Sequence, residues 1–203
     1  MLTLRAALLA SAACLLLLLS ASAQTEQQRQ TMAILKGASE RLMRGDITAL
    51  DDVKALPGDD SVAGLLMFFK QNFYVYSKET EKKAIAAKAA GYITECPSAA
   101  DYIKRLFKKE EGRPKSGMLM NYRQTTLDSL TTANNKFAAN LLIELMDESN
   151  LEVPPGDFAV ALAKMGIPSA PFAKTELKAA ATPEGVTKWK SWWEENKDGF
   201  PDK

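Results

Sequence analysis

The apolar residues of this 203-residue chain recur at helical spacing in nearly every segment, and this periodicity constrains the fold more than any other feature. No stretch alternates strictly enough between apolar and polar residues, with enough Val, Ile and Thr, to predict a strand. The pattern therefore predicts an all-α protein. The expected helices cover residues 26–44, 47–56, 62–76, 77–91, 99–109, 118–130, 136–147, 157–165, 169–178 and 183–196.

Turn and capping residues mark the ends of several expected helices. Gly45 is placed to stop the first helix, and Asp46 to cap the short helix that follows. Residues 59–61, Asp-Asp-Ser, supply capping oxygens for the next helix. Thr182 precedes Pro183, which is the usual order at a helix start because proline is tolerated at the first helical position.

Apolar stripes indicate which helix faces are buried. The first helix has an expected inner face of Met32, Leu35, Leu42 and Met43. The helix over 62–76 is apolar nearly all round, with one stripe of Val62, Leu65, Leu66, Phe69, Phe73 and Tyr76 and a second of Met67, Phe68, Tyr74 and Val75. Such a helix is expected to lie buried between neighbours, or to offer its spare stripe to a partner.

The first 23 residues have the pattern of a secretory signal peptide. Arg5 provides a basic start, residues 6–19 form an apolar run, and Ala21 to Ala23 form a small-residue cleavage site. The apolar run has 14 residues, fewer than the roughly 20 that a spanning helix needs. We therefore expect cleavage before Gln24, export to the periplasm or the extracellular space, no membrane span after cleavage, and a single domain over residues 24–203.

Removal of this segment leaves a neutral chain with one cysteine. The remaining residues include 25 basic and 25 acidic side chains, and Cys96 without a second thiol. Neutrality argues against binding to nucleic acid or to anionic lipid, which both require a surplus of positive charge. A lone cysteine cannot form an intramolecular disulfide, so apolar burial has to stabilise the fold, and Cys96 itself is expected to be a small buried apolar residue.

Residue types that commonly carry chemistry are scarce. The chain contains no histidine, which excludes histidine triads, histidine metal sites and imidazole relays. The acidic pairs consist of adjacent residues, which point about 100° apart on a helix and do not converge on one substrate. No phosphate loop, calcium loop or nucleophile motif occurs. The sequence therefore predicts no catalytic residue, no metal site and no cofactor.

A faint internal repeat accompanies the helical pattern. The turn positions Ser61, Ser98, Asn134 and Ser169 are separated by 37, 36 and 35 residues. The best-matched segments are GYITECPSA, from Gly91, and GIPSA, from Gly166, each preceded by an alanine-rich helix. This spacing predicts a helical hairpin of about 36 residues as the repeating unit.

The segments AAKAAGYITECPSAADYIKRLF and ALAKMGIPSAPFAKTEL resemble HEAT-like helical repeats. The closing segment TPEGVTKWKSWWEENKD is similar to the Trp-rich last helix of exported bacterial HEAT-like proteins. The resemblance implies an α-solenoid of degenerate hairpins whose last unit is sealed by Val186 and the three tryptophans. A TPR-like array and an irregular helical bundle remain open as alternatives.

The expected function is a non-enzymatic scaffold that binds a protein or peptide in the cell envelope. Tyr74, on the spare stripe, and Arg113 and Lys115, in a charged loop, are the predicted contact residues. The alternatives are an envelope enzyme or glycan-binding domain that uses carboxylates and tryptophans, and a structural subunit that dimerises through the apolar helix.

Overall fold

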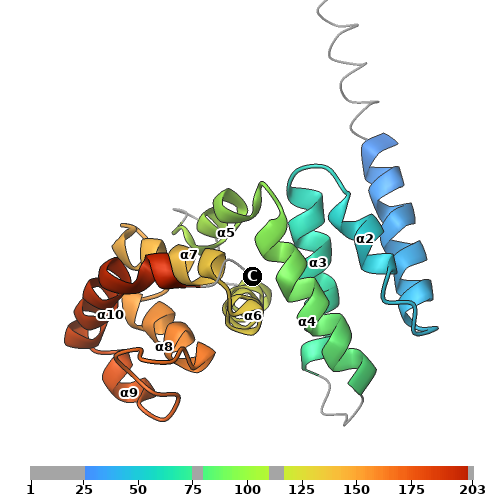
Figure 1. The fold of residues 1–203 in the computed structure, drawn as a ribbon. Coiled ribbons are helices and arrows are strands. Elements are labelled where there is room, and N and C mark those ends of the chain that lie inside the picture. Colours follow the sequence, from blue (N-terminus) through green and yellow to red (C-terminus); the bar gives the residue numbers. More distant parts are fainter. Residues whose placement is uncertain (1–25, 75–79, 110–116, 201–203) are drawn as a thin grey trace, which may run out of the picture. The chain divides into compact units, whose positions relative to one another are not determined.

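The computed structural model of the chain describes residues 26–74, 80–109 and 117–200, in which the regular structure is helical and no strand forms (Figure 1). The prediction of an all-α protein is confirmed. Across the described ranges, no helix combines the length and the apolar character needed to cross a membrane. The chain divides into two compact units, the first ending at Val53 and the second running from Lys54 to Lys203.

A first helix over residues 26–42 precedes the labelled elements. These are α2 (Ala49–Lys54), α3 (Asp59–Phe73), α4 (Thr80–Glu95), α5 (Ala99–Phe107), α6 (Gly117–Ala133), α7 (Lys136–Asp147), α8 (Pro155–Met165), α9 (Leu177–Ala180), α10 (Pro183–Asn196) and the 3₁₀ turn η1 (Lys197–Gly199).

In the first unit, Arg41 fixes the turn between the first helix and α2. Its guanidinium bonds Asp46, with Nε 2.7 Å from Oδ2, and pairs with Asp52. Asp46 also accepts hydrogen bonds from the backbone and the hydroxyl of Thr48, and these bonds together with Arg41 lower the pKa of Asp46 to about 2. Gly45, at φ 81°, supplies the left-handed residue that ends the first helix, as predicted.

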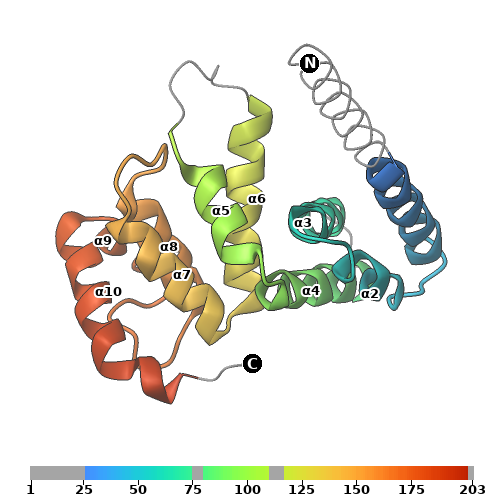
Figure 2. The ribbon, with the colours of Figure 1, turned by 90° about the horizontal axis from the view of Figure 1, so that it is seen from above.

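In the second unit, α3 and α4 lie side by side and form the most closely packed helix pair (Figures 1 and 2). Leu65, Phe68 and Phe69 are buried on α3. Small buried side chains at Ala89 and Ala90 on α4 leave room for a close approach of the neighbouring backbone.

The later helices continue the packing in chain order. Helix α4 contacts α6, α6 contacts α8, and α7 pairs with α8. Buried Arg123 ties α6 to the end of α5, because its Nε donates to the Leu106 carbonyl at 2.9 Å. Helix α10 packs against α7, α8 and α9, where Trp189 and Trp193 are almost fully buried.

Several predicted boundaries are confirmed and others are wrong. Helix α7 has the predicted ends, and the Thr182 side chain caps α10 by accepting from the Gly185 backbone at 3.0 Å. The helix predicted over 169–178 is wrong, since only α9 forms in this stretch. Gly91 lies inside α4 and does not end it. Ser61 lies in the first turn of α3, whose cap residue is Gly58, and donates its hydroxyl to the Gly58 carbonyl.

The predicted inner face of the first helix is partly wrong. Met32 and Met43 are 66% and 78% exposed, whereas Leu42 is buried. On α3, Phe73 was expected in the buried stripe but is 42% exposed. Burial is complete at Phe69 and falls one turn later, so the last turn of α3 is not covered by the helices that bury its earlier turns.

Candidate functional site

The predicted contact residues have different outcomes. Tyr74, which follows the last turn of α3, is 43% exposed. Arg113 and Lys115 lie outside the described residues, so their prediction stays untested. Within the described ranges, no group of three or more His, Cys, Asp or Glu side chains could hold a metal ion.

Two neighbouring exposed aromatic rings form a surface that we call the aromatic patch: Phe73 and Tyr74. Phe73 stacks on buried Phe69 with ring centroids 4.7 Å apart, and meets Tyr74 edge-on at 5.1 Å. The ammonium of Lys70 lies 5.1 Å from the centroid of the Tyr122 ring. The patch therefore presents exposed aromatic surface, and its Phe73 ring is held by the buried Phe69 ring.

Asp128 on α6 holds Tyr74 in place. The Tyr74 hydroxyl donates a hydrogen bond to Asp128 Oδ2, and Gln124 Nε2 donates to the other carboxylate oxygen at 3.0 Å. Partial burial, followed by the bond to Asp128 and its negative charge, raises the pKa of Tyr74 to about 12. Tyr74 thus stays a neutral hydrogen-bonded phenol across the physiological pH range.

Asp128 also lines a groove between α6 and α8, which we call the α6–α8 groove. The groove has a volume of about 130 Å³. Its lining residues are Gln124, Leu127, Asp128, Thr131, Asp157, Val160, Ala161 and Lys164. Asp128 therefore lines the groove and also accepts the hydrogen bond from Tyr74, so it connects the aromatic patch to the groove.

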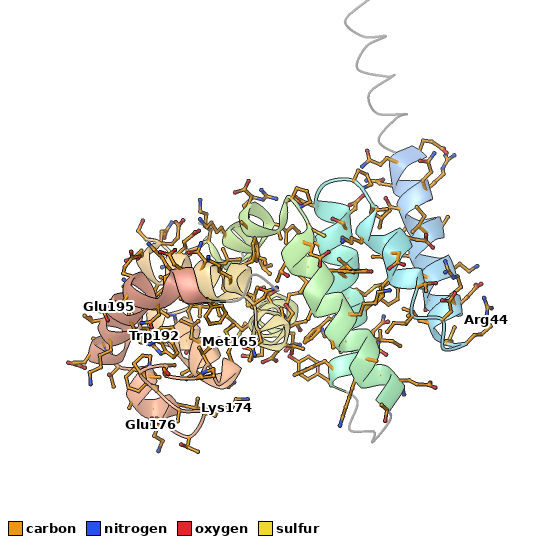
Figure 3. The ribbon with its side chains drawn as sticks, in the orientation of Figure 1. Arg44, Met165, Lys174, Glu176, Trp192 and Glu195 are labelled. Atoms are coloured by element: carbon orange, nitrogen blue, oxygen red, sulfur yellow. The ribbon has the colours of Figure 1, made fainter. Side chains whose placement is uncertain are left out.

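A second hollow, the C-terminal pocket, lies where three separate segments meet. It has a volume of about 410 Å³. Its lining residues are Asn134, Ile167, Pro168, Ser169, Trp192, Asn196, Gly199 and Phe200. Trp192 on α10, labelled in Figure 3, is the partly exposed member of the tryptophan cluster, and its ring meets the buried Trp189 ring edge-on at 5.6 Å.

The three tryptophans were predicted to have the same role, but their side chains differ in exposure. Trp189 and Trp193 are buried core residues, 0% and 2% exposed. Trp192 is only partly buried and lines the C-terminal pocket. Sequence reasoning missed this pocket because its walls come from three segments that are more than 20 positions apart in the chain. The Asn-Asn pair at 134–135, which favours a left-handed turn, was the available signal.

Phe73 and Asp128 were also missed as surface residues. Phe73 continues the apolar stripe of α3, so the spacing of apolar residues predicts that it is buried. Its exposure depends instead on how far the neighbouring helices extend. Cys96 behaves as predicted for a buried residue: it is 4% exposed and donates to the Tyr92 carbonyl at 3.3 Å. Burial raises the pKa of its thiol, which lowers its reactivity.

In comparisons with known proteins, no family model, no curated protein and no solved structure matches the chain.

Proposed function

We propose that this protein is an exported, non-enzymatic scaffold of stacked helical hairpins that binds a protein or peptide through the aromatic patch and the α6–α8 groove. The observation that carries the proposal is the exposed pair Phe73 and Tyr74, held in position beside a groove that shares Asp128 with them. Aromatic rings fixed in this way lose little entropy on binding and are typical anchors of protein interfaces.

The order of helix contacts supports the solenoid part of the proposal. Helices α4, α6 and α8 are the second members of successive pairs, and each contacts the next. This is the contact order expected when each hairpin buries its apolar face against the next one.

The lining of the groove narrows the chemistry of the partner. Asp128 and Asp157 place two carboxylates in the groove against the single ammonium of Lys164. A segment with an apolar or aromatic side chain for the patch and a basic side chain for the groove complements this arrangement. We therefore propose a peptide segment of this mixed apolar and basic composition as the binding partner.

Selection from a random peptide display library tests the binding proposal. We expect the protein to enrich peptides that combine an aromatic residue with Arg or Lys. Their affinity should fall more than tenfold in the double variant Phe73→Ala, Tyr74→Ala, as is typical for loss of interface anchors. Met43→Ala is the matched control, since Met43 is exposed but belongs to the first unit.

A failure to enrich any peptide, or enrichment that the double variant leaves unchanged, would remove the aromatic patch as the binding surface. Circular dichroism of the double variant at the same time shows whether the fold is intact. Tyr74→Phe keeps the ring and loses the bond to Asp128, so it separates the contribution of ring contact from that of ring positioning.

Export has its own test. Fractionation of the source cell and sequencing of the protein's amino terminus should find the protein outside the cytoplasm, with Gln24 as its first residue. A protein that keeps residues 1–23 and stays in the cytoplasm contradicts the localisation while leaving the peptide-binding proposal intact.

A further inference from the structure

The C-terminal pocket has a lining that differs from the rest of the molecule. Charged residues make up 25% of the chain, yet none of the pocket's lining residues, all in the described part of the chain, carries a charge. A charged ligand would lose its hydration there without gaining an ion pair. The pocket therefore suits an uncharged ligand.

The same lining combines aromatic faces with hydrogen-bonding groups. Trp192 and Phe200 supply rings, and the Phe200 ring in turn contacts the buried Trp193 ring at 5.5 Å between centroids. Asn134 and Ser169 add an amide and a hydroxyl, and neither side chain bonds to another described residue. An amide and a hydroxyl both donate and accept, so they match a ligand that carries several hydroxyl groups.

Two left-handed backbone positions lie at this pocket. Among the described residues, positive φ outside glycine occurs at Asn134 (47°), Asn150 (63°) and Ser169 (64°), and two of these line the pocket. Asparagine adopts this conformation readily, whereas at Ser169 it costs free energy and persists where the surrounding structure over-determines it, often at ligand sites. Both residues line the same pocket.

We propose that the C-terminal pocket binds a neutral sugar residue, with the apolar face of the ring on Trp192 and hydroxyl groups bonded to Asn134 and Ser169. The volume of about 410 Å³ lies in the usual range for small-molecule sites, roughly 300–1,000 Å³. This site is separate from the aromatic patch, and it adds a ligand class to the protein-binding function without depending on it.

Titration calorimetry and tryptophan fluorescence with neutral oligosaccharides test the proposal. The probes are maltotriose, cellotriose and chitotriose, with a uronic acid trisaccharide as the charged comparison. We expect saturable binding of at least one neutral probe at millimolar concentration or below, and weaker binding of the charged one. Trp192→Ala should lower the affinity more than tenfold, because it removes the stacking surface.

Two glycine variants test the polar contacts without adding strain. Asn134→Gly and Ser169→Gly remove the amide or the hydroxyl while the backbone keeps its positive φ, which glycine adopts freely. Each should weaken sugar binding about three- to tenfold, the effect of one lost hydrogen bond. The double variant Phe73→Ala, Tyr74→Ala is the matched control and should bind sugar as the unchanged protein does.

Three results would overturn the inference. These are no saturable binding of any neutral probe, binding that Trp192→Ala leaves unchanged, and preference for the charged trisaccharide. Loss of peptide binding in Trp192→Ala, with no sugar bound, would make the pocket part of the peptide site instead. Failure of the peptide-binding proposal would show in the aromatic-patch variants and leave the sugar titrations unaffected, so the two proposals fail independently.

Discussion

The turns that follow α4 and α8 share the residues Pro-Ser-Ala but continue differently. After α4, Pro97 and Ser98 lead directly into α5 at Ala99. After α8, Gly166 takes a left-handed conformation at φ 68°, and no further helix forms until α9 at Leu177. Similar local sequences thus give a tight helix–helix turn in one place and a long irregular connection in the other.

The residue after the alanine explains the difference. Ala99 is followed by another alanine, whereas Ala170 is followed by Pro171. A proline disfavours the helical conformation of the residue before it, so a helix cannot begin at Ala170 as easily as it begins at Ala99. The comparison teaches that two turns with the same Pro-Ser-Ala residues differ at the position after the alanine, where only the first turn can continue as a helix without a proline.

The large buried side chains that follow the two turns come from different kinds of element. After the first turn, buried Ile103 and Phe107 on α5 complete the core. After the second turn, Phe172 from the irregular connection and Trp189 and Trp193 from α10 are the large buried side chains, with the rings of Phe172 and Trp189 6.2 Å apart. Large aromatic residues therefore supply most of the buried side-chain volume after the second turn.

The largest expected loss of stability is at Trp189, one of the buried aromatic residues after the second turn. Trp189→Ala should lower the free energy of unfolding by about 3–5 kcal/mol, because it leaves a cavity at a fully buried position. Urea unfolding followed by circular dichroism measures the loss. Trp189→Phe should cost much less, since the indole N–H that it removes is buried without a hydrogen-bond partner among the described residues. Equal losses in the two variants would contradict the packing explanation.

The contact between α9 and α10 gives the next largest effect. A Cβ added at Gly185 would lie 2.3 Å from the Ala179 carbonyl oxygen, so Gly185→Ala should cost about 1–3 kcal/mol through overpacking of the backbone. Thr187→Ala, at an exposed position on α10, is the control and should change stability by less than about 0.5 kcal/mol. A neutral Gly185→Ala variant would show that α9 can move away from α10 freely.

The glycines of the two matched segments should respond with opposite sign. Gly166→Ala should lower the free energy of unfolding by about 1–2 kcal/mol, because its φ of 68° disfavours any residue with a Cβ. Gly91→Ala should raise it by about 0.5–1 kcal/mol, since Gly91 lies inside α4 with no atom within 4 Å of the added Cβ. Thermal or urea unfolding of both variants measures the two changes. A lower free energy of unfolding in both variants would contradict the predicted difference between the two glycines.

The serines of the two turns give the smallest effect. Ser98 donates its hydroxyl to the Gly58 carbonyl at 2.8 Å, so Ser98→Ala should cost about 0.5–1 kcal/mol. Ser169 has φ 64°, so Ser169→Gly should gain roughly 0.5–1 kcal/mol by relieving strain. The same urea titrations measure both changes. A loss of stability in Ser169→Gly would show that its hydroxyl contributes to the fold, against the role proposed for it in the pocket.

Most of the helices could be predicted because their signals are short-range. The ends of α7 and the Thr182 cap of α10 follow from residues within one turn of the boundary. The helix over 169–178 was predicted wrongly, because the helical spacing of its residues does not show that Pro171 disfavours a helical backbone at Ala170. Of the candidate sites, Tyr74 was predicted from its stripe. Phe73 and the C-terminal pocket could not be, because their exposure depends on where other helices end.

The sequence by itself determined the helical class and the positions of its main caps and stops, because helix periodicity, proline restriction and glycine freedom act over a few residues. Only the tertiary structure decided which apolar side chains stay at the surface. It buried Trp189 and Trp193 while leaving Trp192 at a pocket, and it brought Asn134, Ser169 and Phe200 together. These outcomes depend on contacts between segments far apart in the chain, and such contacts leave no local pattern in the sequence.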